Sequence, residues 1–99
     1  MLKKVRRSSG NVFRDLGFSR VAAENLRIRS ELMIQLEKLI EREGLTQTAA
    51  ARLFGVSQPR VSDLVRGRIE LFSIDVLVNM LAKAGVRVAV TTRSRRRAA

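Results

Sequence analysis

The chain has 99 residues, enough for one small domain with a modest core. Twenty Lys and Arg residues against nine Asp and Glu residues give a net charge of +11, which favours a polyanionic partner such as nucleic acid. Cysteine and histidine are absent, which excludes disulfide frameworks, zinc fingers, thiol nucleophiles and histidine acid–base chemistry. With no Trp, no Tyr and four Phe, a platform of stacked aromatic residues for single-stranded nucleic acid is also disfavoured.

The positive charge is concentrated at the two ends of the chain. Residues 1–10 and 93–99 are predicted to be basic tails, the first of them flexible. They hold Lys3, Lys4, Arg6, Arg7, Arg93, Arg95, Arg96 and Arg97. Without these eight, twelve basic residues remain against nine acidic ones, a net charge of +3. The tails are either solvated segments or segments that contact phosphate without sequence preference, and both interpretations stay open.

Several classes of protein are not expected from this sequence. No apolar run approaches the roughly 20 residues of a membrane helix, and the basic residues 1–7 are not followed by the apolar stretch of a secretion signal. We therefore expect a cytoplasmic protein without a membrane partner. An enzyme, a metal and a cofactor are not expected either, because carboxylates such as Glu41 and Glu43 fit a solvated, charge-paired helix surface.

The predicted domain spans residues 11–92, and its first part ends in a long helix. Apolar side chains in the opening segment, at Val12, Phe13, Leu16 and Phe18, are expected to pack on the domain itself. Ser19 is a plausible helix cap, and no helix breaker follows until Gly44. A helical stripe is formed by Leu32, Met33, Leu36, Leu39 and Ile40. The residues before Ser30 form either the first turns of this helix or a separate one.

Two short helices joined by a glycine turn are predicted at about residues 46–67. Thr46 is the expected cap of a helix over Gln47–Phe54, Gly55 makes the turn, and Ser57 caps a third helix from Gln58 to about Arg66. The small Ala51 permits close helix crossing, and the apolar contacts that fix the crossing angle come from Ala50, Phe54, Val56, Val61 and Leu64. This combination predicts a helix-turn-helix, with a plain helical hairpin as the alternative.

A fourth helix and a strand are predicted after the connection of residues 68–72. Ser73 is the expected N-cap, and apolar residues at helical spacing continue until Gly85. Val86, Val88 and Val90 then alternate with Arg87, Ala89 and Thr91, a strand pattern over residues 86–92. The predicted fold class is therefore all-α with a helix-turn-helix and one C-terminal β-strand. A lone strand needs a second strand to satisfy its backbone hydrogen bonds. The candidates are the same strand of a second copy in a dimer, the segment at Val12, and the sheet edge of a partner protein.

The helix that begins at Gln58 is the predicted DNA-reading helix, because recognition helices place N-terminal residues against base edges in the major groove. At 100° per residue, Val61, Leu64 and Val65 face inward, whereas Pro59, Ser62, Asp63 and Arg66 face outward. Gln58 can hydrogen-bond adenine, Pro59 can touch a thymine methyl group, and Asp63 can accept from cytosine.

Other residues of this region are expected to contact phosphate. Gln47 and Ser57 lie at helix N-termini, where backbone N–H groups and the helix dipole favour an anion. Arg60, Arg66 and Arg68 are predicted phosphate clamps. Plainer interpretations stay open: Ser57 is a helix cap in any case, Arg60 and Arg66 can be solvated, and Asp63 can pair with either arginine.

The segment from Leu45 to Gly67, LTQTAAARLFGVSQPRVSDLVRG, resembles the Cro/repressor-type helix-turn-helix proteins of the XRE family. The opening SGNVFRDLG at residues 9–17 resembles the start of a group of small antitoxins similar to HigA, and RIELFSIDVL at residues 68–77 resembles the connection in that group. Together these likenesses cover roughly residues 8–92. They imply a repressor-like helical bundle.

The resemblance also implies a function. It is that of a dimeric type II antitoxin that pairs with a HigB/RelE-like toxin, binds double-stranded operator DNA and represses its own operon. DNA-contact positions by this likeness are Gln47, Ser57, Gln58, Pro59, Arg60 and Asp63. The second base-reading position, commonly polar in phage repressors, is Pro59 here, so the operator sequence does not carry over. The alternatives are a solitary phage-type repressor and a nucleoid-associated protein that binds DNA without sequence preference.

Overall fold

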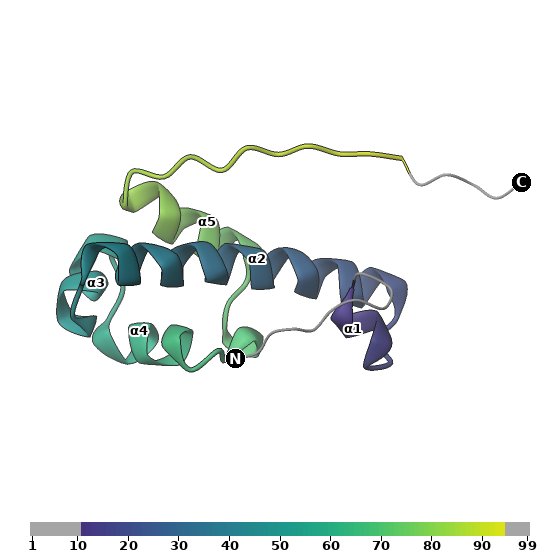
Figure 1. The fold of residues 1–99 in the computed structure, drawn as a ribbon, viewed down its shortest axis with the longest axis horizontal. Coiled ribbons are helices and arrows are strands. Elements are labelled where there is room, and N and C mark those ends of the chain that lie inside the picture. Colours follow the sequence, from purple (N-terminus) through teal and green to yellow (C-terminus); the bar gives the residue numbers. More distant parts are fainter. Residues whose placement is uncertain (1–10, 95–99) are drawn as a thin grey trace, which may run out of the picture.

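The structure is a computed structural model that describes residues 11–94. A long helix, α2, forms the axis on which the shorter helices pack (Figure 1). The elements are α1 (Val12–Asp15), α2 (Arg20–Glu43), α3 (Gln47–Phe54), α4 (Gln58–Val65), the 3-10 helix η1 (Ile69–Leu71) and α5 (Ile74–Lys83). The predicted tail of residues 1–10 and the last five residues of the predicted tail 93–99 lie outside the described residues.

The helix boundaries follow the caps that the sequence offers. The Ser19 hydroxyl accepts a hydrogen bond from the Ala22 N–H, and α2 continues without interruption to Glu43, so the residues before Ser30 are its first turns. Gly44 ends this helix in the left-handed conformation, which suits glycine because it has no Cβ. Ser73 caps α5, where its hydroxyl accepts from the Val76 N–H.

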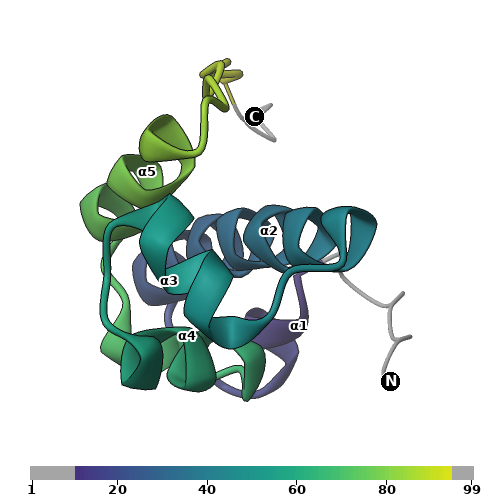
Figure 2. The same ribbon diagram turned by 90° about the vertical axis from the view of Figure 1, so that its left-hand side faces the viewer.

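The core lies between the inner face of α2 and the helices that follow it in the chain, and Figure 2 shows α3 crossing α4 beside α2. Its members are Leu32, Met33, Leu36, Leu39, Ala50, Ala51, Phe54, Val61, Leu64, Phe72, Leu77, Met80 and Leu81. The contacts predicted to fix the helix crossing are confirmed: Ala50, Phe54, Val61 and Leu64 are buried, and Val56 packs half-buried against them. The position of α4 is therefore set by the main core.

The β-strand predicted over residues 86–92 is wrong, since residues 11–94 contain no strand. After the backbone bond from the Val86 N–H to the Leu81 carbonyl, the chain runs extended beside no neighbouring strand (Figure 1). Part of the valine alternation has another cause: Val86 and Val88 pack partly buried against the core, while Arg87 and Ala89 face outward. Val90 continues the pattern but is 82% exposed. One-sided burial produces the same period of two without a hydrogen-bonded partner. The described fold is all-α.

The opening segment packs on the domain only in part. The Asn11 side chain accepts from the Phe13 N–H and donates to the Ala23 carbonyl, which ties α1 to α2. The ring of Phe13 packs edge-on against that of Phe18, with 6.2 Å between centroids. Leu16 nevertheless stays 69% exposed, and Val12, Phe18 and Val21 are exposed as well. The end of the molecule at α1 therefore keeps an uncovered apolar surface.

Gly55 is constrained both by its backbone and by its surroundings. Its φ is +70°, and a Cβ there would lie 2.6 Å from Cδ and 2.9 Å from Nζ of Lys83. We expect Gly55→Ala to lower the free energy of unfolding by about 1–2 kcal/mol from backbone strain, plus the displacement of Lys83. Urea denaturation measures this cost. Gly44→Ala is the matched control, because φ is +60° there and nothing lies within 4 Å of the new Cβ. Equal costs at the two sites would contradict a role of Lys83.

Candidate nucleic-acid interface

The helices α3 and α4 pack against each other, and a left-handed glycine, Gly55, joins them. Helix α3 begins at Gln47, directly after Thr46, whose hydroxyl accepts from the Ala49 N–H at 3.0 Å. Helix α4 begins at Gln58, after Ser57 in the extended conformation of an N-cap. The Ser57 hydroxyl makes no cap hydrogen bond, so it remains available to an anion. Pro59 has no N–H, and the Arg60 N–H already donates to the Ser57 carbonyl at 3.1 Å.

The faces of α4 are those predicted, with one exception. Val61 and Leu64 are fully buried, whereas Pro59 and Arg66 are exposed. Ser62 and Asp63 are half-buried at the edge of the outer face. The exception is Val65, predicted to face inward but 47% exposed, because it ends the helix beyond the edge of the core. Gln58 is exposed at the open N-terminal end of α4, and Gln47 is half-buried at the start of α3.

Arg60 is directed toward its own domain. Its Nη1 donates to the Leu71 carbonyl at 3.0 Å, and its guanidinium carbon lies 4.3 Å from the centroid of the Phe72 ring. The side chain is half-buried and lies on the flank of α4 next to the inner face, away from Pro59 and Arg66. This predicted phosphate clamp thus links α4 to the Leu71–Phe72 segment of the connection between α4 and α5.

Comparison with known proteins supports the helix-turn-helix geometry. A family described as a helix-turn-helix domain matches residues 12–93. A solved structure of a candidate XRE-family transcriptional regulator is 32% identical, with a TM-score of 0.70, and the match covers 79% of this chain and 88% of that one. The chain belongs to the XRE-type helix-turn-helix family. A comparison with curated proteins finds no significant match.

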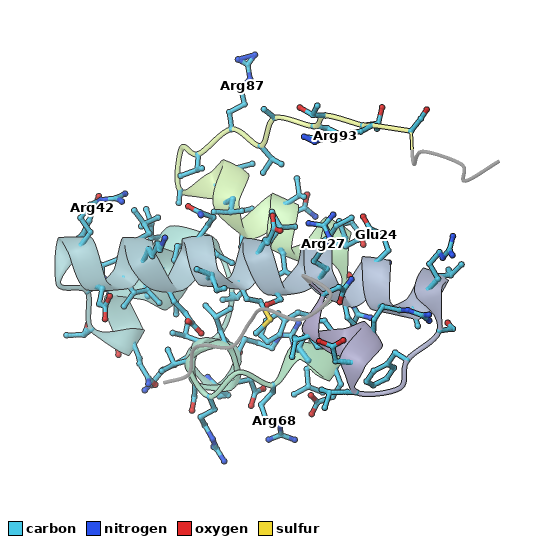
Figure 3. All side chains as sticks on the ribbon, turned by 45° about the vertical axis from the view of Figure 1, so that its right-hand side comes forward. Glu24, Arg27, Arg42, Arg68, Arg87 and Arg93 are labelled. Carbon is cyan, nitrogen blue, oxygen red and sulfur yellow. The ribbon has the colours of Figure 1, made fainter. Side chains whose placement is uncertain are left out.

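Arg68 of this XRE-family protein follows α4 and points away from the ribbon (Figure 3). Its Nε donates to Oε2 of Glu70 at 3.0 Å, and the pair is largely exposed. The backbone hydrogen bond of Glu70, and then that from Arg68, hold the pKa of this carboxyl below its ordinary value. Exposed ion pairs are weak, so Arg68 can exchange Glu70 for a phosphate oxygen at little cost.

Asp63, half-buried on α4, forms no ion pair with Arg60 or Arg66 within the described residues. On α2, Arg27 pairs with Glu24 (Figure 3) and also with Glu31, both at 2.6 Å. The described part of this XRE-family protein holds no cluster of acidic groups suited to a metal ion, and none of its helices could cross a bilayer.

Arg29 is a structural residue that the sequence did not indicate. From α2, its Nη1 donates to the carbonyls of Ile69 and Phe72, both at 3.3 Å, and its Nε donates to Asn25 at 2.7 Å. The two carbonyls lie 40 and 43 residues further along the chain, so no local pattern predicts the contact. Arg29 therefore holds the connection after α4 against α2.

Proposed function

We propose that this XRE-family protein is a sequence-specific DNA-binding repressor that reads its operator with α4. The observation that carries this proposal is the surface position of Gln58 and Pro59 on a helix that Val61 and Leu64 anchor in the core. Base recognition in the major groove requires an exposed N-terminal turn on a rigid support. A regulator of this kind acts by binding and not by catalysis. We place it in the cytoplasm, with access to the chromosome.

The side chains of the interface divide into two groups. Gln58 is positioned to hydrogen-bond an adenine, Pro59 to contact a thymine methyl group, and Asp63 to accept from a cytosine amino group, with Ser62 beside them. The phosphate contacts come from Gln47 and Ser57 at the helix N-termini, and from Arg66 and Arg68. These contacts set the orientation of the protein on the duplex, whereas the first group supplies sequence preference.

The proposed repressor is a homodimer on a near-palindromic site. A single eight-residue helix contacts few base pairs, and two copies related by a two-fold axis double the contacts. We expect half-site centres about 34–36 Å apart, one helical turn of DNA. Footprinting of the purified protein on the DNA upstream of its own gene tests this. Protection of two half-sites one turn apart is the expected result, and uniform coverage of the fragment would favour a nucleoid-associated protein.

We further propose that the repressor is the antitoxin of a type II toxin–antitoxin pair, with a HigB/RelE-like toxin as its partner. The support is the likeness of residues 9–17 and 68–77 to HigA-type antitoxins, together with the exposed apolar side chains of Val12, Leu16 and Phe18. Exposed apolar groups that lie together often mark protein interfaces. Co-expression with the small gene next to its own tests the proposal. Failure to co-purify, with no effect of that gene on growth, would favour a solitary repressor.

Gln58→Ala is expected to weaken operator binding by about 1–3 kcal/mol and to change binding to random DNA little. The reason is that the amide contacts base edges, which carry the sequence, and not phosphate. Fluorescence anisotropy on operator and scrambled duplexes of equal length measures both affinities. Thr48→Ala, at an exposed position on α3, is the matched control. Equal losses on the two duplexes would overturn the assignment of Gln58 as a base-reading residue.

A further inference from the structure

The connection between α4 and α5 is held from two sides by arginine side chains. Arg60 of α4 donates to the Leu71 carbonyl, and Arg29 of α2 donates to the carbonyls of Ile69 and Phe72. The ring of Phe72 is 1% exposed and carries the Arg60 guanidinium over its face at 4.3 Å. Three carbonyl groups of η1 and its C-cap Phe72 thus receive guanidinium donors.

The contact made by Arg60 needs a guanidinium. Its planar group stacks on the aromatic face and donates a hydrogen bond within the same plane. A lysine ammonium carries the same charge but presents a compact, strongly hydrated group that does not match both contacts at once. Lysine at this position is therefore expected to keep attraction to phosphate but to lose the fixed link between α4 and the Leu71–Phe72 segment.

We propose that Arg60 is a positioning residue, which fixes the N-terminal turn of α4 and acts on DNA through Gln58 and Pro59 instead of contacting phosphate. This inference rests on the proposed operator binding by α4. Gln58 and Pro59 immediately precede Arg60 in a helix of eight residues, so the anchoring of Arg60 restrains their backbone. The Ser57 side chain makes no cap hydrogen bond at this end, so the bond from Arg60 to the Leu71 carbonyl adds a polar restraint to the apolar anchoring by the buried Val61.

The experiment compares R60A, R60K and R66A in the full chain, on the duplex protected in footprinting and on a scrambled duplex of equal length. R60A and R60K are both expected to lose about tenfold in operator affinity, with little change on the scrambled duplex. The slope of log K against log salt stays that of the wild type, since no phosphate contact is lost. R66A, the matched control, is expected to weaken both duplexes and to reduce the slope by about 0.9 per lost contact.

A second variant tests the same link without altering an arginine. Phe72→Leu removes the aromatic face but keeps an apolar side chain in the core, and we expect the same operator-selective loss with an unchanged salt slope. Circular dichroism at the assay temperature verifies that each variant is folded.

The outcomes separate the two proposals. A reduced salt slope in R60A, restored in R60K, would overturn the positioning role and make Arg60 a phosphate clamp. Operator affinity of R60K and Phe72→Leu equal to that of the wild type would overturn it as well. Absence of operator preference in the wild type would instead contradict the proposed function, and this is measured before any variant is compared.

Discussion

Replacing Phe54 with alanine is expected to lower the free energy of unfolding by about 3–5 kcal/mol, a larger loss than the backbone strain expected at Gly55. Phe54 is 1% exposed and ends α3, where its ring lies in the core shared with α4 and α5. The substitution removes the transfer free energy of the ring and leaves a cavity that neighbouring helices fill only in part. For a domain of this size, the loss is a large share of the total stability.

Urea denaturation followed by circular dichroism measures the effect of Phe54→Ala. The matched control is Arg52→Ala, two residues earlier on the same helix but exposed, for which a change within about 0.5 kcal/mol is expected. Because Phe54 precedes the Gly55 turn, we also expect operator binding to weaken as the α3–α4 crossing loosens. A loss below about 1 kcal/mol would contradict the assignment of Phe54 to the core that supports α4.

Raising the salt concentration from 50 to 200 mM is expected to lower operator affinity about a thousandfold. The expectation assumes about six phosphate contacts per dimer, which give a slope of log K against log salt near −5. The chain carries a net charge of +11, and Arg66 and Arg68 lie exposed at and beyond the end of α4. Each cation that neutralises a phosphate releases condensed counterions, so the loss follows the number of contacts.

A titration of operator duplex by fluorescence anisotropy at several salt concentrations measures this slope. A variant that ends at residue 92 is the informative comparison, because it lacks the four arginines of the predicted C-terminal tail. A slope unchanged by the truncation assigns the phosphate contacts to residues 1–92, whereas a smaller slope assigns part of them to the C-terminal tail. A wild-type slope near zero would contradict DNA binding through phosphate contacts.

Not all of the side chains on α4 that the sequence predicts as DNA contacts face the solvent. Gln58, Pro59 and Arg66 are exposed on or next to α4 as the sequence predicts, but Arg60 turns to the ring of Phe72. Asp63 is half-buried and, within the described residues, forms no ion pair with either of the two arginines. The interface that we propose therefore contains fewer contacting residues than the sequence predicts. In this proposal Arg60, which faces away from DNA, fixes the position of the base-reading residues.

Local chemistry was enough to predict where most helices begin and end. Thr46 and Ser73 cap α3 and α5 through hydroxyl groups that bond to N–H groups three residues ahead, and Gly44 and Gly55 end helices because glycine tolerates positive φ. These signals act within one helical turn, so they are present in the sequence before any tertiary contact forms. The helical stripe of α2 likewise predicted which of its faces is buried.

Tertiary contacts decided the conformation after α5 and the partners of Arg29 and Arg60, because these contacts join residues far apart in the chain. The alternation at Val86 and Val88 is compatible with a strand or with an extended segment packed on one side, and only the neighbouring elements distinguish the two. The bonds of Arg29 span 40 and 43 residues, and Arg60 meets an aromatic ring beyond the end of its own helix. Sequence periodicity reports which side of a segment is buried, whereas the partner that covers it is set by the packing of the whole chain.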